Sequence, residues 1–421
     1  KLESKGFELK SETDSEALVH MITIGLNSGQ EPIEAVRQTL KRVTGTWGLC
    51  VLFKDYDLII CARNGSPLIL GQGDGESFVS SDPHALSQHT QNIFYLEDGD
   101  LAVLTKQGID ISRLDGGSSS TSMTVLEDEW GEADMAGYPH FMLKEIHEQP
   151  EALRRCISGR LDKANGSAKL GGLKLEPIRL RTSPHVRLIG CGTALNACRI
   201  GQLAIESLAR IPAVAHVASE FRYNDPVINP NAIHFAVSQS GETADTISAV
   251  KEIQLKGGDV HGIINVVGSS IARLSGRGVY IHSGPEQAVA STKAFTNMVS
   301  ALLLFSLTIS ECKPSRKKQI VQQLREIPNK VATQLQKQDS SYNTAVEILD
   351  NSKSAIFIGR GASAPLVNEG ALKMMEVAYL PCLAYPGGEL KHGPIALIEE
   401  GTPVIAVAPT DAYHSLMESS I

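Results

Sequence analysis

The residues best suited to chemistry gather in the last third of the sequence. Glu369, Lys373 and Glu376 are spaced i, i+4 and i+7, which places all three on one face of a helix. A lysine between two carboxylates suits carbonyl chemistry, because the amine can polarise a carbonyl while a carboxylate moves a proton between neighbouring carbons. The same spacing is also typical of an exposed salt-bridge ladder.

The residues around this charged stripe favour a site over a surface ladder. Apolar residues cover most of the other faces, so we expect the helix to be buried nearly all round. A charged stripe on a buried helix must be paired or must line a site. The apolar positions are Ala371, Leu372, Met374, Met375, Val377 and Ala378.

A run of hydroxyl side chains marks a second candidate site. Ser238-Gln239-Ser240-Gly241-Glu242-Thr243 follows a strand-like stretch at 233–238 and precedes a helix, so hydroxyls and backbone N–H groups would form an anion site built from dipoles. The run lacks the Gly-Lys-Ser/Thr of a nucleotide P-loop, which favours a small phosphoester over ATP. A simple helix N-cap at Ser240 is the alternative. The turn Cys191-Gly192-Thr193, after the strand-like stretch 186–190, would close the other side of the same pocket.

His392 lies in the Gly- and Pro-rich stretch 388–394. A lone histidine is more often structural, but such loops frequently carry functional groups, and both interpretations stay open. No cluster of His, Cys and Asp has metal-ligand spacing, so we expect neither a metal nor another cofactor.

Two kinds of region must position these residues. Residues 1–112 combine helices, one starting at the capping-box pattern 13–16 and one at 32–43, with short strand-like runs, which indicates an α+β region with antiparallel pairing. The runs lie at 47–53, 58–62, 66–70, 93–96 and 101–104. From residue 186 onward, strands alternate with helices, which predicts parallel sheets sandwiched by helices.

An internal repeat organises the second region. Gly190 and Gly359 are 169 residues apart, and further pairs match at this offset: Ile189 and Ile358, Gly192 and Gly361, Ala209 and Ala378, Pro212 and Pro381, Glu220 and Glu389. An ungapped match implies two copies of one α/β unit. We expect a first domain with its Gly/Ser-rich and acidic linker at 1–137, a connecting segment at 138–169, the first copy at 170–312, connecting helices at 313–351 and the second, incomplete copy at 352–421.

Composition excludes several function classes. The 421 residues carry 39 Lys plus Arg against 47 Asp plus Glu, a net charge of −8, which disfavours a general nucleic-acid or acidic-membrane binder. Seven cysteines without a CxxC pair disfavour a zinc ribbon or a disulfide framework and fit the cytoplasm. The longest apolar run, 298–309, is too short to span a bilayer, and no signal peptide opens the chain. Lys1 and the helix-like end at 411–421 lead us to expect a longer polypeptide.

Taken together and in order, several motifs carry a resemblance over nearly the whole chain. They are Ser11–Glu16, Ala62–Leu68, His140–Pro150, Ser238–Thr246, Val289–Thr296, Glu369–Lys373 and Gly388–Pro394. With them the sequence resembles the glutamine–fructose-6-phosphate aminotransferase (isomerizing) family, whose members are also called glucosamine-6-phosphate synthases. The resemblance implies an α+β N-terminal-nucleophile glutaminase fragment followed by two sugar isomerase (SIS) domains, which are flavodoxin-like parallel-sheet sandwiches.

The resemblance also implies an activity and its partners. The family hydrolyses glutamine with an N-terminal cysteine and passes the ammonia to fructose 6-phosphate, which gives glucosamine 6-phosphate and glutamate. The family's ring-opening histidine, which His392 matches, comes from the neighbouring subunit and so implies a homodimer. No nucleic-acid or membrane partner is implied.

Site residues follow from the same resemblance. Glu376 matches the base that moves the proton between C1 and C2, Lys373 and Glu369 match its partners, and Asp14 matches the carboxylate that holds the glutamine α-amino group. The sugar-phosphate residues it implies are Thr193, Ala194, Ser238, Gln239, Ser240, Thr243, Val289 and Ser291.

The sequence also departs from the family pattern. The nucleophile cysteine would precede Lys1 and the Schiff-base lysine would follow Ile421, so we expect the printed polypeptide alone to release no glutamate from glutamine. Ala194 stands where the family usually has a phosphate-contacting serine, and Gln287-Ala288 where it has Ile-Gly. A related SIS enzyme that isomerises or deaminates an amino-sugar phosphate, and a sugar-phosphate sensor without catalysis, are the alternatives.

Overall fold

The computed structural model describes residue 2 and residues 7–81, 83–87, 89–126, 135–337 and 341–421. The chain forms two compact units, Lys1–Asp134 and Met135–Ile421.

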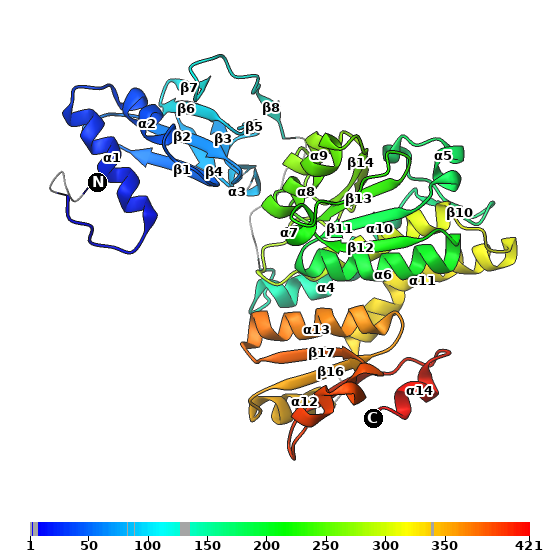
Figure 1. Cartoon of the computed structure of the whole chain (residues 1–421). Helices are drawn as coiled ribbons and strands as arrows, with labels where there is room; N and C mark the ends of the chain where they lie inside the picture. Colours follow the sequence, from blue (N-terminus) through cyan, green and yellow to red (C-terminus); the bar gives the residue numbers. More distant parts are fainter. Residues whose placement is uncertain (1, 3–6, 82, 88, 127–134, 338–340) are drawn as a thin grey trace. The chain divides into compact units, whose positions relative to one another are not determined.

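Two antiparallel sheets and two longer helices build the first unit (Figure 1). One sheet has the order β1-β2-β6-β7 and the other β4-β3-β5-β8. The helices are α1 (Asp14–Asn27), α2 (Pro32–Leu40) and the short α3 (Pro83–Ser87). The strands are β1 (Trp47–Leu52), β2 (Ile59–Asn64), β3 (Ile69–Gln72), β4 (Ser77–Ser80), β5 (Asn92–Tyr95), β6 (Asp100–Thr105), β7 (Gly108–Arg113) and β8 (Thr124–Val125).

Apolar packing explains the layers of this unit. Ile22 and Val36 of α1 and α2 pack with Ile60 on one face of the first sheet, whereas Cys61, on the opposite face, packs with Leu70 of the second sheet. The predicted antiparallel pairing is confirmed, and strands β4, β7 and β8 are additional to the predicted runs.

The predicted capping box and linker need correction. Thr13 is the N-cap of α1 but makes no capping bond; instead the Glu16 carboxylate accepts the N–H groups of Lys10 and Ser11, both at 2.7 Å. Part of the expected linker is folded rather than free, because Ser119 and Thr121 donate to the buried Asp100 carboxylate. Residues 127–134, in the same expected linker, lie outside the described residues.

A five-stranded, all-parallel sheet forms the larger lobe of the second unit (Figure 1). Its order is β12-β11-β13-β14-β15, the flavodoxin-like arrangement. The strands are β11 (Val186–Gly190), β12 (Ala213–Val217), β13 (Ile233–Ser238), β14 (Val260–Ile264) and β15 (Gly278–Tyr280). Helices α6 (Gly192–Ala209) and α10 (Lys293–Thr308) cover one face, and α7 (Ala218–Phe221), α8 (Ala244–Leu255) and α9 (Ser270–Ser275) cover the other.

A smaller parallel sheet, β17-β16-β18, forms the second lobe. Its elements are β16 (Ala355–Gly359), α13 (Ser363–Ala378), β17 (Cys382–Pro386), β18 (Val404–Val407), α14 (His414–Glu418) and the 3₁₀ turns η3 (Glu389–His392) and η4 (Pro394–Leu397). Strands β11 and β16, and strands β12 and β17, are related by the 169-residue offset at both ends. The predicted repeat is therefore confirmed for the strand–helix–strand unit.

Connecting elements surround the two lobes. Before the larger lobe come α4 (Phe141–Ile157), the β9–β10 hairpin (Leu161–Asp162 and Ser167–Ala168), η2 (Gly171–Leu173) and α5 (Pro177–Thr182); between the lobes run α11 (Pro314–Gln336) and α12 (Ser341–Asp350).

Candidate active site

Both predicted turns lie at the topological switch point of the five-stranded sheet. Strand β11 has β12 on one side and β13 on the other, so the chain leaves the two central strands in opposite directions. Cys191–Thr193 follows β11, and Gln239–Thr243 follows β13. Ligands of open α/β sheets bind at the carboxyl ends of the strands at such a point.

The hydroxyl groups after β13 shape their own turn. Ser238 Oγ accepts the Gly241 N–H at 3.0 Å and lies 3.2 Å from Thr243 Oγ1, and Ser240 Oγ accepts the Glu242 N–H at 3.2 Å. Thr243, not Ser240, is the N-cap of α8, and the Thr243 side chain makes no capping hydrogen bond to a described residue. The simple N-cap at Ser240 is therefore wrong, and the first-turn N–H groups of α8 remain available to an anion.

Lys373 is the centre of the charged stripe on α13. Its Nζ donates to Glu376 Oε2 at 2.6 Å and lies 3.5 Å from Glu369 Oε1. It also donates to Thr193 Oγ1 at 2.9 Å, and Thr193 Oγ1 donates to Glu369 Oε1 at 2.8 Å. The stripe is thus joined to the turn after β11, which excludes a ladder confined to its own helix.

Asn196, one turn further along α6, is a residue that the sequence analysis missed. Its Nδ2 donates to Glu369 Oε2 at 2.9 Å, and Arg199 Nη1 donates to its Oδ1 at 3.4 Å. Both carboxylate oxygens of Glu369 are therefore held by α6 side chains. The i, i+3 spacing of Thr193 and Asn196, which puts both on one helix face, was the available signal.

Exposure increases along the charged stripe. The side chain of Glu369 is 6 % exposed, that of Lys373 16 % and that of Glu376 31 %. The buried Glu369 thus positions the amine of Lys373. Lys373 in turn binds the carboxylate of Glu376, which solvent or a ligand can reach.

The prediction that α13 is buried nearly all round is wrong. Met375 is 40 % exposed and Val377 52 % exposed, whereas Val367 and Ala371 are buried. One face of α13 packs against Phe357 of β16 and Cys382 of β17, and the charged stripe meets α6. The sequence pattern did not distinguish these faces from the exposed one.

The loop before α10 carries two more predicted sugar-phosphate residues. Val289 is 98 % exposed, and Ser291 Oγ donates to Glu286 at 2.8 Å. Ala194 is buried in the first turn of α6, where its N–H bonds the carbonyl of Cys191. Gln239 is half-buried, and its carbonyl accepts the N–H of Asn265.

His392 and Asp14 are the remaining predicted site residues. His392 is exposed in η3, and no hydrogen bond or ion pair within the described part of the chain links it to Glu369, Lys373 or Glu376. Asp14 belongs to the first unit, where it is exposed in the first turn of α1.

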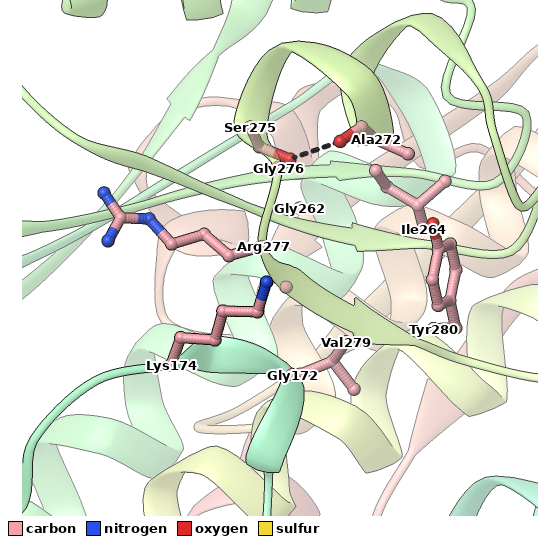
Figure 2. Close-up of a pocket in the computed structure, with 11 residues that line it drawn as sticks. Gly172, Lys174, Gly262, Ile264, Ala272, Ser275, Gly276, Arg277, Val279 and Tyr280 are labelled. Carbon is pink, nitrogen blue, oxygen red and sulfur yellow. Dashed lines mark hydrogen bonds between the residues drawn. The ribbon is translucent and has the colours of Figure 1, made fainter.

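Figure 2 shows a separate cavity of about 270 Å³ beside edge strand β15. Lys174 and Arg277 lie on one side of it and Tyr280 on the other. The Arg277 guanidinium is bound to Asp259 at 2.8 Å, and none of the predicted site residues lines the cavity.

The described residues provide neither a metal-binding cluster nor a membrane-spanning helix. The residues described contain no group of three or more His, Cys, Asp or Glu side chains that could hold a metal ion. Within the same residues, no helix combines the length and the apolar character needed to cross a bilayer.

Several known proteins are similar to this chain in sequence or in fold. The SIS domain family matches residues 179–307 and 348–420. The chain is 41 % identical to the glutamine–fructose-6-phosphate aminotransferase (isomerizing) of Chlorobaculum tepidum and 39 % identical to that of Thermus thermophilus, in each case over all of this chain and 69 % of the relative. Its fold is similar to the C-terminal domain of glucosamine-fructose-6-phosphate aminotransferase from Francisella tularensis, with a TM-score of 0.65 and 36 % identity over 69 % of this chain and 81 % of that structure.

Proposed function

The chain belongs to the glutamine–fructose-6-phosphate aminotransferase (isomerizing) family, and we propose that it serves the reaction that this name describes. In that reaction the amide nitrogen of glutamine replaces the C2 oxygen of fructose 6-phosphate, and the ketose becomes an aldose. The products are glucosamine 6-phosphate and glutamate.

One observation carries the proposal: the hydrogen-bonded chain from Thr193 and Asn196 through Glu369 and Lys373 to Glu376. It joins the switch-point turn of the larger lobe to a carboxylate on the smaller lobe. A sensor needs a phosphate site but has no use for a lysine-held carboxylate beside it.

The turn after β13 is the proposed phosphate site. Ser238, Gln239, Ser240 and Thr243 would surround the phosphate together with the first-turn N–H groups of α8. These groups are dipoles rather than cations, which suits a ligand that must enter and leave in each turnover.

Glu376 is the proposed base of the isomerisation. Once the nitrogen is bound at C2, the Glu376 carboxylate takes a proton from C1 and returns it to C2, while Lys373 holds the carboxylate in place. His392 is the proposed ring-opening residue. It is exposed in this chain, which agrees with a role toward the site of a second subunit in a homodimer.

The first unit is the proposed fragment of a glutaminase domain. Two stacked antiparallel sheets with helices on an outer face agree with that assignment, and Asp14 would hold the α-amino group of glutamine. The seven cysteines are free, in keeping with a cytoplasmic protein.

The test uses the complete gene product that contains this chain. Binding of fructose 6-phosphate is measured by calorimetry, and solvent deuterium entering C1 and C2 of the sugar is followed with and without glutamine. We expect binding, exchange and glutamine-dependent glucosamine 6-phosphate. Exchange with no dependence on any nitrogen donor would instead favour an isomerase, and binding without exchange would favour a sensor.

A further inference from the structure

Several hydrogen bonds join helix α4 to the residues that flank the loop with Val289 and Ser291. Helix α4 lies against α10, which follows that loop. Three contacts join α4 to residues on either side of the loop: Arg155 donates to the carbonyls of His282 and Ser283, Lys293 donates to Glu148 at 2.5 Å, and Asn297 donates to the carbonyl of Ala152 at 2.9 Å.

Glu145, also on α4, reaches the loop itself. Its Oε1 accepts the N–H of Gln287 at 2.6 Å and the N–H of Ala288 at 3.1 Å. Glu145 is 2 % exposed, and its Oε2 is buried with no hydrogen-bond partner among the residues described. The carboxylate is therefore used for two backbone amides immediately before Val289.

The carboxylate of Glu286, a residue of the same loop, binds the other end of the loop. Glu286 accepts the N–H groups of Thr292 at 2.8 Å and Ala294 at 3.1 Å, and also the hydroxyl of Ser291. Residues 286–292, the sugar loop, thus wrap between the carboxylates of Glu145 and Glu286. Such a loop is ordered before its ligand arrives and loses little conformational entropy on binding.

Burying Glu145 is unfavourable without these amides. Burial raises the pKa of its carboxyl, and the bonds from Gln287 and Ala288 act in the opposite direction. A buried acceptor of this kind is retained at a cost to stability. Simple helix packing would be served as well by an apolar residue of the same size, so the geometry assigns the carboxylate to the loop.

We infer that Glu145 is a positioning residue for the sugar phosphate: by binding two amides of the sugar loop, it holds the backbone that presents Val289 and Ser291. The inference rests on the proposed function, since it takes this loop as part of the sugar site. Glu145 itself would not contact the sugar.

The test compares two substitutions of Glu145 in the complete gene product. Glu145→Met keeps the length of the side chain and removes both acceptors, whereas Glu145→Gln keeps a carbonyl oxygen that can accept both N–H bonds. We expect Glu145→Met to raise KM for fructose 6-phosphate by about 10-fold to 100-fold, because two hydrogen bonds to a charged group are lost. We expect kcat to change by about twofold at most, and Glu145→Gln to retain a KM near that of the wild type.

Asn297→Leu is the matched control. Asn297, on α10, is fully buried and donates to the carbonyls of Ala152 on α4 and of Ile281. Among the described residues its side chain bonds no amide of the sugar loop, so this variant should lower Tm without raising KM. Amide hydrogen exchange of residues 286–294, measured without sugar, should be faster in Glu145→Met alone.

The outcomes separate the inference from the proposed function. A wild-type protein that binds no fructose 6-phosphate contradicts the proposed function. A wild-type protein that binds it, with KM unchanged in Glu145→Met or raised equally in Glu145→Gln or Asn297→Leu, overturns the positioning role alone.

Discussion

Strands β11 and β16 each end in a glycine and lead through a second glycine, Gly192 or Gly361, into a long helix. Those second glycines have φ of 52° and 54°, where a side chain is strained. The helices α6 and α13 also end alike, at Arg210 and Tyr379 in the left-handed conformation. The backbones of the two lobes are thus equivalent even at these positions of positive φ.

The candidate site residues on this shared backbone differ between the two lobes. The charged positions 369, 373 and 376 of α13 correspond, 169 residues earlier, to Ile200, Ala204 and Ser207 of α6. Conversely, Ser238 at the end of β13 and Ser240 beyond it correspond to Val407 at the end of β18 and Pro409 beyond it. The larger lobe supplies hydroxyl and amide dipoles, and the smaller lobe supplies charged side chains. The shared fold alone specifies neither set of residues.

Removing the base of the second lobe should have the largest effect. Glu376→Gln keeps the shape of the side chain but cannot accept a proton, so formation of glucosamine 6-phosphate should fall by about 10²-fold to 10⁴-fold. Sugar binding and glutamine hydrolysis should persist. The measurement is product formation together with deuterium exchange at the sugar carbons. Exchange at the wild-type rate would reduce Glu376 to a structural partner of Lys373.

Gly241, in the turn after β13, cannot be replaced by a residue with a side chain without strain. Gly241 has φ of 66°, and a Cβ there would lie 2.1 Å from Ser269 Oγ, whereas the corresponding residue of the second lobe is Thr410. Gly241→Ala should lower the free energy of unfolding by about 3–5 kcal/mol and abolish tight sugar-phosphate binding.

Gly257→Ala is the control for backbone strain. Gly257 has φ of 81° and open space around its Cβ position, so its substitution should cost only about 1 kcal/mol. Equal losses in the two variants, measured by denaturant unfolding, would mean that the crowding around Gly241 is relieved at no cost.

Acidic pH should lower the free energy of unfolding of the larger lobe. Burial, with smaller contributions from Arg187 and Arg277, lowers the pKa of His234 and of His261 from 6.5 to about 4. Between these values the unfolded chain binds protons that the folded chain does not, so stability falls as pH falls below about 6.5. The loss for the two together should be about 3 kcal/mol between pH 7.5 and 5.5.

Unfolding by denaturant at pH 7.5, 6.5 and 5.5 measures this loss. In the second lobe Pro403 corresponds to His234 and cannot titrate. A His234→Gln variant should lose about half of the pH dependence, and a variant with the full dependence would assign it to other groups.

Thr193→Ala makes the two helix starts alike, because Ala362 occupies the corresponding position. The change removes the hydroxyl that bonds both Glu369 and Lys373, and Asn196 still holds Glu369. We expect kcat/KM for fructose 6-phosphate to fall by about 10-fold. Thr193→Ser should restore most of the activity, and a Ser variant as slow as the Ala variant would mean that the methyl group matters instead.

The smallest change expected is a gain. Ala194 corresponds to Ser363, which is 6 % exposed in the second lobe, so this backbone accommodates a serine at the position. Ala194→Ser should tighten fructose 6-phosphate binding by about 5-fold to 10-fold through one added hydrogen bond. Calorimetry gives the dissociation constant, and unchanged or weaker binding would indicate a different ligand or a compensating contact.

The repeat and the parallel sheets could be predicted because their signals are local or periodic. The offset between Gly190 and Gly359 and the buried strands such as 233–238 contain that information directly. The packed face of α13 could not be predicted, since its apolar residues surround the helix and only the fold decides which of them meet β16 and β17.

Contacts between segments far apart in the chain could not be predicted from the sequence either. Asn196 meets Glu369 across 173 residues, and Glu145 meets Gln287 across 142. Neither belongs to a motif whose spacing indicates a partner. The resemblance identified Val289 and Ser291 but not the helix that holds their loop.

The two bonds from α6 to Glu369 also bear on how independently the two copies of the repeat can change. The Glu369 carboxylate of one copy depends on a hydroxyl and an amide of the other. Without the first copy this buried charge loses both partners, and without the second copy Thr193 and Asn196 lose their acceptor. These contacts couple the two copies, so a substitution at Thr193, Asn196 or Glu369 in one copy also changes the environment of its partners in the other.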